Sequence, residues 1–560
     1  MENKTIARTL RLLSQLMELH GENPFKIKSM ANAAFKVDKL PFPIARMTLP
    51  AMEQVEGLGK STAAKVWELL QKGSIAELDS LLEKTPPGIA EMLQIKGLGP
   101  KKIMIVWKEL GIENVGELYY ACNENRLIEA KGFGAKTQEE IKKIIEFRMA
   151  SSGRYLYARV EEFAEDLIGT LKSNIPASLI SYTGDYRRKC EIIDGLDILV
   201  GTALSEEIVV QIRGAGLTVT EQSTDRLATE NPEGIKIFFD FCSVADYGWQ
   251  LIEKTGSPEH VQNLKLLLGS EDVSGKTETE IYSQAGIPFI EPELRENTNE
   301  LELAKQNKLP KLITFEDLKG SLHNHSNWSD GVNSLEEMAL YCRDELKMEY
   351  LGICDHSKSA FYAQGLNEIR VAAQQREIDE LNKKLAPFHI FKGIESDILY
   401  DGSLDYDDAI LKTFDFVVAS VHSILKMSEE KATQRLITAI ENPYTTILGH
   451  PTGRMLLTRS GYPIDHKKVI DACAANQVVI EINANPLRLD LDWRWHRYAI
   501  EKGVMLSVNP DAHRTAGFMD MHYGILVARK GGVSAANCLN ALDKEALLKY
   551  FQSKKAVTAS

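Results

Sequence analysis

The feature that most constrains this chain is a series of short apolar runs, each ending on a side chain of a metal-binding type. Runs of this kind begin at Tyr350, His389, Phe416, Thr446 and Val504. Continuous apolar runs separated by helical patterns are typical of buried parallel strands. The carboxyl ends of parallel strands in a barrel meet at one face, where residues distant in sequence converge. The second half of the chain therefore predicts an α/β barrel with a site at its strand ends.

Histidine, aspartate and glutamate occupy these predicted strand ends. Nine of them are candidate metal ligands: His323, His325, Asp330, His356, Glu395, His422, His450, Asp511 and His513. The chain has 12 histidines, and half of them lie in this set. If each were an ordinary buried core histidine, their common position at strand ends would be a coincidence. Imidazoles and carboxylates without thiolates suit Zn²⁺, Mn²⁺ or Fe²⁺. Nine ligands are too many for one ion and fit about three divalent ions.

The order of these motifs carries a resemblance to a known family. The series H-x-H…D, D-H-S, G-I-E, S-V-H-S, G-H-P and D-A-H, over residues 319–560, resembles the PHP (polymerase and histidinol phosphatase) metallohydrolases. The resemblance implies a distorted (β/α)7 barrel with three metals, Glu395 bridging two of them. It also implies phosphoester hydrolysis, with hydroxide held by His323, His325 and Glu395 as nucleophile. Ser321 stands where relatives often carry Asp, and we expect only an indirect effect on the ligands.

Three glycine motifs in the first 150 residues predict DNA-backbone binding. Each has an apolar residue between two glycines, lies beside lysine and leads into a helical pattern. The candidate DNA-binding residues are Gly57, Gly59, Lys60, Gly97, Gly99, Lys101, Gly132, Gly134 and Lys136. Glycines let a phosphate approach the backbone, helix N-terminal amides point at it, and lysines supply counter-charge. Three copies within eighty residues predict helix-hairpin-helix units that hold a duplex without reading its sequence.

The middle of the chain resembles a second family. Residues 183–200 resemble the palm signature of family X DNA polymerases, G-S-x-R-R-x-x-E-x-x-G-D-x-D-h-L, and residues 255–260 and 292–296 resemble thumb segments of its bacterial members. With the predicted helical domains and barrel, the resemblance to the bacterial PolX type covers the whole chain. It implies that Gly184, Arg187 and Arg188 bind a nucleotide, and that palm carboxylates bind Mg²⁺ or Mn²⁺ if that site is active.

The palm departs from the family pattern at the residues that matter most. Gly195 and Phe238 stand where two of the three carboxylates belong, and Asp185 replaces a serine beside the incoming triphosphate. Asp197 remains as a catalytic and metal-binding candidate. Asp194 and Asp240, one and two residues from the family positions, are the possible substitutes, although a shift of one residue turns a strand side chain to the other face. These departures predict a weakened or inactive polymerase site.

Lys65 corresponds to the lyase lysine of polymerases of the β type. Schiff-base chemistry needs a lysine whose pKa is lowered by burial or by neighbouring cations. Ser61 stands where a basic neighbour is usual, so a phosphate-binding role is favoured over lyase catalysis. Both roles stay open at this point.

Length and composition predict several soluble domains. We expect a helical DNA-binding domain over 1–78, a fingers-like domain over 79–150, a palm over 151–245, a thumb over 246–300, a linker over 301–318 and the PHP barrel over 319–560. Seven scattered cysteines without a C-x-x-C motif and no long apolar run predict a cytoplasmic protein, without a membrane. The net charge of −13 is uneven, since residues 1–150 carry 22 basic against 19 acidic residues.

These observations predict a DNA-repair phosphodiesterase. We expect 3′→5′ exonuclease action, with abasic-site incision or 3′-end cleaning as further reactions, by a monomer on gapped or nicked DNA. Two alternatives stay open: a working gap-filling polymerase that uses dNTPs, and a small-molecule phosphatase of the histidinol phosphatase kind. Trp493 and Trp495 suit either stacking on bases or packing between helices, and Arg454, Arg488 and Arg514 suit either DNA phosphates or a solvated surface.

Overall fold

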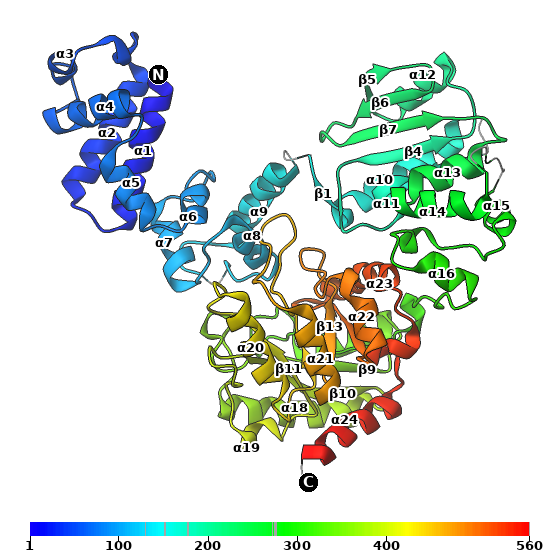
Figure 1. Ribbon diagram of the computed structural model, residues 1–560. Coiled ribbons are helices and arrows are strands. Elements are labelled where there is room, and N and C mark those ends of the chain that lie inside the picture. The colour runs from blue at the N-terminus through cyan, green and yellow to red at the C-terminus, as the bar shows by residue number, and fades with distance from the viewer. Residues whose placement is uncertain (129, 151–152, 176–178, 271–272, 274–276, 559–560) are drawn as a thin grey trace. The chain divides into compact units, whose positions relative to one another are not determined.

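The computed structural model of the protein describes residues 1–128, 130–150, 153–175, 179–270, 273 and 277–558. The chain forms two compact units, Met1–Phe147 and Arg148–Ser560, and each is described by itself. The first is helical, and the second contains a five-stranded sheet, a seven-stranded sheet, a short two-stranded pair (β1, Tyr155–Leu156, with β3, Ile192–Ile193) and their helices (Figure 1). The predicted fold class, helical hairpin domains followed by α+β and α/β parts, is confirmed.

The first unit is built from short amphipathic helices. In α1 the buried side chains Ile6, Leu10, Leu13 and Met17 recur every three or four residues and pack on α2. The unit's elements are α1 (Asn3–Leu19), α2 (Pro24–Lys39), η1 (Ile44–Arg46), α3 (Leu49–Glu53), α4 (Lys60–Lys72), α5 (Ala76–Glu83), α6 (Pro87–Met92), α7 (Pro100–Met104), the π-helical turn η2 (Ile105–Glu109), α8 (Val115–Asn123) and α9 (Ala135–Ala150), which runs past the unit's end.

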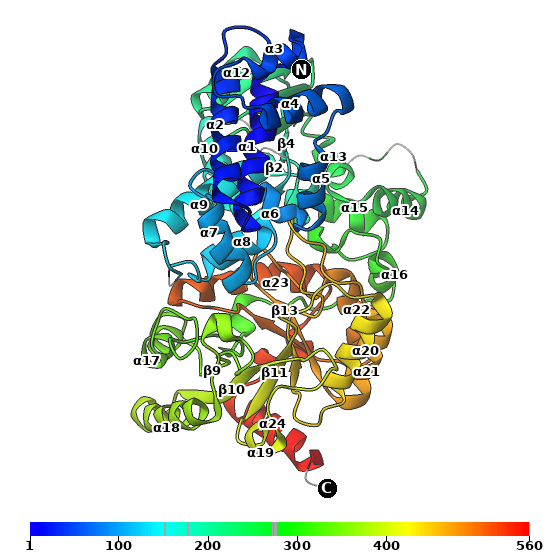
Figure 2. The ribbon, with the colours of Figure 1, turned by 90° about the vertical axis from the view of Figure 1, so that its left-hand side faces the viewer.

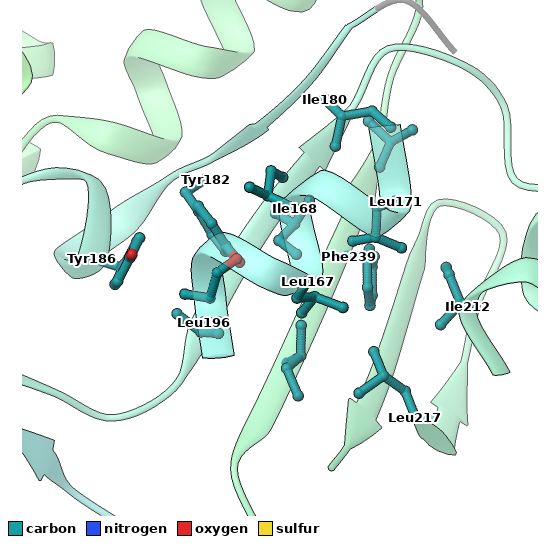
Figure 3. Close-up of a cluster of buried hydrophobic side chains, with 14 of the residues drawn as sticks. Leu167, Ile168, Leu171, Ile180, Tyr182, Tyr186, Leu196, Ile212, Leu217 and Phe239 are labelled. Carbon is teal, nitrogen blue, oxygen red and sulfur yellow. The ribbon is translucent and has the colours of Figure 1, made fainter. Parts of the chain in front are cut away.

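The palm region of the second unit is a five-stranded sheet with helices. Its strand order is β2-β4-β7-β6-β5, with β4 and β7 parallel and the other pairs antiparallel. Leu167, Leu171, Leu196 and Phe239 belong to the buried cluster between helix α10 and the sheet (Figure 3). The elements are β1 (Tyr155–Leu156), α10 (Tyr157–Asn174), β2 (Ile180–Tyr182), α11 (Gly184–Arg187), β3 (Ile192–Ile193), β4 (Leu196–Val200), α12 (Glu206–Gly214), β5 (Thr218–Gln222), β6 (Arg226–Glu230) and β7 (Lys236–Phe241).

A small helical region follows the palm. It contains α13 (Tyr247–Thr255), α14 (Pro258–Leu268), α15 (Glu278–Gln284), η3 (Pro292–Leu294) and α16 (Glu300–Lys305). Leu301, Ala304 and Leu312 are buried in the same apolar cluster as Trp249 and Ile281. Part of the predicted linker over 301–318 therefore belongs to the packed core of this region. The linker prediction rested on the charged residues of this segment, which are interspersed with the apolar side chains that pack.

The C-terminal region is a parallel sheet of seven strands in the order β14-β13-β12-β11-β10-β9-β8. A parallel bridge between Asn324 and Ala512 joins the loops that follow the two edge strands, so the sheet is almost closed into a barrel. The strands are β8 (Gly320–Ser321), β9 (Tyr350–Ile353), β10 (His389–Asp397), β11 (Phe416–Ser420), β12 (Ile447–Leu448), β13 (Val479–Asn483) and β14 (Leu506–Asn509). Most of them are buried along their whole length, as the apolar runs predicted.

Helices surround this barrel (Figures 1 and 2). They are η4 (Phe315–Asp317), α17 (Leu335–Leu340), the π-helical turn η5 (Tyr341–Glu345), η6 (Phe361–Ala363), α18 (Glu368–Leu385), α19 (Asp408–Leu411), α20 (Glu429–Ile440), α21 (His466–Asn476), η7 (Trp493–Trp495), α22 (His496–Glu501), η8 (Thr515–Asp520), α23 (Met521–Lys530), η9 (Ala535–Asn537), η10 (Leu539–Ala541) and α24 (Lys544–Thr558). Phe551 of α24 stacks on Phe416, the first residue of β11, with ring centroids 5.1 Å apart. Helix α24 therefore packs at the amino-terminal end of the barrel, opposite the predicted ligands.

Ion pairs and hydrogen bonds join the palm region and the helical region that follows it to the barrel. The indole of Trp493 donates to Glu191 at 3.2 Å, and Arg529 donates to Glu293 at 2.8 Å. His522 lies 2.8 Å from Glu161. Among the described residues, no helix is both long and apolar enough to cross a membrane.

Candidate metal centre and nucleic-acid elements

All nine predicted metal ligands lie at the carboxyl ends of the barrel strands or in the loops that follow them. His323, His325 and Asp330 follow β8, and Glu395 is in β10. The other five follow β9, β11, β12 and β14: His356, His422, His450, Asp511 and His513. The imidazoles of His323 and His325 are fully buried. The parallel topology thus gathers, in one buried place, residues separated by up to 190 positions.

Glu395 lies at the middle of this cluster, with five imidazoles around its carboxylate. The distances from its oxygens are 3.4 Å to His323 Nε2, 3.6 Å to His325 Nε2, 3.0 Å to His356 Nδ1, 3.1 Å to His422 Nε2 and 3.1 Å to His450 Nε2. Burial alone would raise the pKa of Glu395, but the surrounding histidines hold it well below its usual range. Glu395 is therefore an ionised carboxylate at the centre of the histidine cluster.

Three overlapping groups have ligand atoms close enough to hold a cation. They are His325, Asp330, His356 and His513; His323, His325 and Asp511; and His356, Glu395 and His422. Within each group the ligand atoms lie within 4.8 Å of one another. His325 and His356 each belong to two groups, so three ions would lie side by side. His450 is in none of the groups, although it touches Glu395.

The chemistry of the cluster fits divalent cations. Among the described residues, His323 Nε2, both ring nitrogens of His356 and Glu395 Oε2 are buried and make no hydrogen bond of normal geometry, although carboxylate oxygens lie 3.0–3.5 Å from these ring nitrogens. Buried polar atoms of this kind normally have a partner, and a coordinated ion would satisfy them. Burial and the neighbouring His513 and His356 lower the pKa of His325 to about 3, so it is a neutral imidazole able to donate a lone pair.

Carboxylates behind the ligands fix the orientation of their rings, and the sequence analysis did not select them. Glu481 accepts from His323 Nδ1 at 2.7 Å, and Asp397 lies 2.6 Å from His422 Nδ1. Asp355 accepts from the backbone and hydroxyls of Ser326 and Ser329, which shape the loop leading to Asp330. Glu481 stands in the middle of the apolar strand β13, much as Glu395 stands in β10, and a carboxylate in a buried strand is a signal that could have placed it at the site.

The palm carboxylates are not gathered in the same way. In the described part of the chain, Asp194, Asp197 and Asp240 do not appear in any group of three ligand atoms within 4.8 Å. Asp194 is 80% exposed and faces Arg154 at 3.6 Å. Asp240 pairs with Lys254 at 3.1 Å. Asp197 is paired in register with Phe238 on the parallel strand β7, so no carboxylate lies directly beside it there.

The two candidate nucleotide-binding arginines already have carboxylate partners. Arg187 makes a two-pronged contact with Glu278 at 2.8 and 2.6 Å. Arg188 donates to Glu296 at 2.9 Å and also pairs with Asp185. Neutralised guanidinium groups attract a triphosphate far less than free ones do. Gly184 has a φ of +60°, and a Cβ there would lie 2.8 Å from the carboxylate of Asp197, so this glycine lets Asp197 pack against the turn.

The three glycine motifs have a common geometry. Gly57, Gly97 and Gly132 have φ values of +89°, +93° and +84°, which L side chains rarely adopt. Gly59 and Gly99 precede the first residues of α4 and α7, and Gly134 precedes α9. A Cβ on the second glycine of each motif would meet nothing within 4 Å, so the adjoining helix amides are open to a ligand. The predicted lysines Lys60, Lys101 and Lys136 are exposed beside them.

Lys65 has a partner that the sequence did not indicate. It forms an ion pair with Glu77, and its side chain is 19% exposed. An amine engaged in an ion pair is not free to attack an aldehyde, which disfavours the lyase role. The pairing also leaves Lys65 less available for a DNA phosphate.

Of the barrel tryptophans and arginines considered for DNA contacts, most are packed or paired within the protein. Trp493 is buried against the palm, and Trp495 stacks on His466 with centroids 4.7 Å apart, so neither is presented to a base. Arg454 donates to Asp492 and to main-chain carbonyls, and Arg488 is buried. Of the three arginines, Arg514 is the exposed one. The packing interpretation of the tryptophans agrees with the structure.

Comparisons with known proteins agree with this architecture. A helix-hairpin-helix domain matches residues 1–75, and a SAM-like helix-hairpin-helix tandem matches residues 89–146. A protein of Bacillus subtilis named DNA polymerase/3′-5′ exonuclease PolX is 33% identical over 98% of this chain and 100% of its own length. The chain belongs to the PolX family. The family membership expected from the motifs is thereby confirmed.

Shorter relatives match the PHP part of this PolX chain. A protein of Thermoanaerobacter sp. named "Probable phosphatase" is 31% identical over 31% of the chain and 73% of its own length. Another of that name, from Caldanaerobacter subterraneus, is 39% identical over 23% of the chain and 53% of its own length. Sequences similar to the PHP part therefore also occur in shorter proteins that are named phosphatases and not polymerases.

Proposed function

We propose that this PolX chain is a metal-dependent DNA phosphodiesterase that shortens 3′ ends at the PHP centre. The observation that carries the proposal is the buried cluster around Glu395, where the nine candidate ligand side chains lie together and buried ligand atoms without a hydrogen bond suit cations. The name of the B. subtilis relative includes the same exonuclease activity. Helix-hairpin-helix units in the first part of the chain would hold the DNA backbone.

Three divalent cations are the proposed cofactors, with Zn²⁺, Mn²⁺ and Fe²⁺ as the candidates for this donor set. Such ions supply a nucleophile at neutral pH and neutralise charge on the phosphoryl oxygens. The residues of the chain set the site up for this. Glu481 and Asp397 hold the rings of His323 and His422, and the apolar strands around them exclude water. Abasic-site incision and 3′-end cleaning would use the same centre.

The palm is proposed to retain little or no polymerase activity. Among the described residues, its three candidate carboxylates form no group of three ligand atoms within 4.8 Å, and its two candidate nucleotide-binding arginines are paired with glutamates. Two-metal nucleotidyl transfer needs carboxylates that converge on a pair of Mg²⁺ ions. We propose that the palm serves instead to carry DNA ends to the barrel, in a cytoplasmic monomer.

A primer assay tests the proposal and its alternatives together. A labelled primer on a one-nucleotide gap is incubated with Mn²⁺ and all four dNTPs, using wild type, His323→Ala and Asp197→Ala. Shortening in wild type that disappears in His323→Ala, without extension, is the expected result. Extension that survives His323→Ala but is lost in Asp197→Ala would establish the gap-filling polymerase instead. Hydrolysis of small phosphomonoesters without shortening of any primer would favour the phosphatase alternative.

Glu481→Gln is expected to weaken metal binding about 10- to 100-fold, the usual effect of losing a group that orients a ligand. The Glu481 carboxylate accepts from His323 at 2.7 Å, His450 N–H at 3.2 Å, Asn483 at 3.0 Å and Asn509 at 3.1 Å. A glutamine amide would turn a donor toward this ring of donors.

The Mn²⁺ concentration that gives half-maximal hydrolysis is the measurement for Glu481→Gln. Saturating Mn²⁺ should restore most of the rate, because Glu481 orients a ligand and is not one of the nine. The exposed Glu501→Gln is the control and should leave the Mn²⁺ dependence unchanged. An unaltered Mn²⁺ dependence in Glu481→Gln would contradict the orienting role.

A further inference from the structure

Large apolar side chains are exposed around the rim of the metal centre. This apolar rim consists of Val332, Phe361, Tyr400, Ile424 and Met519, which are 57%, 88%, 52%, 55% and 51% exposed. Each follows one of the strand-end ligands by two to six residues in the sequence. Because the strands are parallel, these loops lie at the same end of the barrel as the ligands. Large exposed apolar groups in the same loops as the candidate ligands are candidates for a binding surface.

Phe361, the most exposed member, is presented by a firmly held loop. Leu366 N–H donates to the His356 carbonyl at 2.8 Å, which closes the loop at its base. The carboxylate of Asp405 accepts from Ser357 Oγ at 2.7 Å and from Ser359 N–H at 2.9 Å. The backbone is therefore fixed while the ring stands in solvent, which is the arrangement of a preformed contact.

This loop touches the metal centre directly. The ring of Tyr362, next to Phe361, lies edge-on to the imidazole of His356, with centroids 6.1 Å apart. A ring beside Phe361 thus contacts a predicted ligand. A nucleotide stacked on Phe361 would be a near neighbour of a phosphate at the centre.

Ile424 adds an independent sign of function. Its φ is +55°, a left-handed conformation that is strained for a β-branched residue, yet its side chain is more than half exposed. The buried guanidinium of Arg435 donates to the Ser423 carbonyl at 3.0 Å and to the Ile424 carbonyl at 3.3 Å, and so holds this turn. The strained backbone at Ile424 places its side chain in solvent, so packing within the protein does not compensate for the strain. A contact with a bound ligand would.

The charge beside the rim indicates what that ligand is. The ammonium group of Lys431 lies 4.3 Å from the ring centroid of Tyr400. Aromatic rings next to cations match a single strand, in which bases alternate with phosphates. A protein partner with an apolar face would not require the cation.

We propose that the apolar rim, led by Phe361, is a stacking platform for the unpaired bases of a single-stranded 3′ end. The proposal rests on the proposed nuclease function and deepens it, since it assigns to Phe361 and its neighbours the contact that holds an unpaired end at the metal centre. Duplex ends would have to melt before reaching the centre. Stacking tolerates any base, so no sequence preference is expected.

The test compares Phe361→Ala with Leu548→Ala, a matched apolar truncation on α24 at the opposite end of the barrel. Hydrolysis of a single-stranded oligonucleotide and of bis(p-nitrophenyl) phosphate is measured with Mn²⁺. In Phe361→Ala, KM for the oligonucleotide should rise about 5- to 150-fold, the effect of one lost stack. Its kcat, and both constants for the small ester, should stay near wild type. Leu548→Ala should match wild type on both substrates, and Phe361→Trp should keep the low KM.

A fluorescence measurement separates stacking from other effects. An oligonucleotide with 2-aminopurine as its 3′-terminal base is bound to chains carrying Glu395→Gln, which removes turnover. Quenching that is lost when Phe361→Ala is added supports the platform. An unchanged oligonucleotide KM, or an equal loss on the small ester, would overturn it. Wild type that hydrolyses neither substrate would refute the nuclease function itself, which is a different outcome.

Discussion

Replacing Glu395 by glutamine is expected to abolish hydrolysis of 3′ ends, with a loss on the order of 1,000-fold. Losing a group that merely orients a ligand costs about 10- to 100-fold, and Glu395 is the carboxylate that five imidazoles surround at 3.0–3.6 Å. Glutamine keeps the shape but lacks the negative charge that holds cations together. Its amide would also present a donor to the ligand groups.

Measuring the metal content of Glu395→Gln together with its activity tests whether the loss of activity comes from lost metal. Purified Glu395→Gln should hold fewer divalent ions per chain than wild type, and added Mn²⁺ should not restore the rate. The exposed Glu429→Gln in the first turn of α20 is the matched control and should keep both metal and activity. A Glu395→Gln chain with full metal content and at least a tenth of wild-type activity would show that the nuclease works elsewhere.

The barrel site was largely predictable because each candidate ligand is marked by the few residues around it in the sequence. Glu395 and His422 each stand at the end of an apolar run, and the parallel-strand rule brings such ends together without further knowledge. Glu481 was missed because a carboxylate facing a histidine reveals its role only through a contact across 158 positions. The rim residue Phe361 was missed for a related reason, since exposure is not visible in a sequence.

The palm illustrates what sequence motifs cannot settle. Arg187 and Arg188 match the family pattern, yet their partners Glu278 and Glu296 lie 91 and 108 positions away, Glu278 outside the motifs and Glu296 at the end of a thumb-like segment. Restoring the missing carboxylate is also blocked locally. A Cβ on Gly195 would lie 2.7 Å from the Lys236 carbonyl oxygen. The backbone of β7 therefore leaves no room for an aspartate side chain at the position where the family carries one.

Glu278→Gln is expected to destabilise the second unit by about 3–5 kcal/mol at neutral pH, the usual cost of breaking a buried ion pair. One carboxylate serves two guanidinium groups here. Arg295 is fully buried and donates to Glu278 at 2.5 Å, while Arg187 contacts the same carboxylate at 2.8 and 2.6 Å. Neutralising Glu278 would leave both positive charges without compensation, one of them out of reach of water.

The pH dependence gives this prediction a second, independent readout. Burial alone would raise the pKa of Glu278, but Arg187 and Arg295 outweigh it and hold the pKa below the usual 4.5. A lowered folded-state pKa stabilises the fold fully above pH 4.5, and the contribution is lost as the pH falls through the lowered value. Wild type and Glu278→Gln should therefore differ most near pH 7 and converge in acid.

Urea unfolding of the full chain followed by a palm-region probe measures the effect. The surface variant Glu302→Gln, which breaks an exposed pair with Lys305, should change stability by less than about 0.5 kcal/mol. A Glu278→Gln midpoint equal to wild type at pH 7 would mean that Arg187 is not committed to the structure. Arg187 would then be available to a triphosphate. The proposal that the palm has lost nucleotide binding would lose its main support. A large loss that shrinks in acid would instead show that the palm now uses this arginine to hold its own fold.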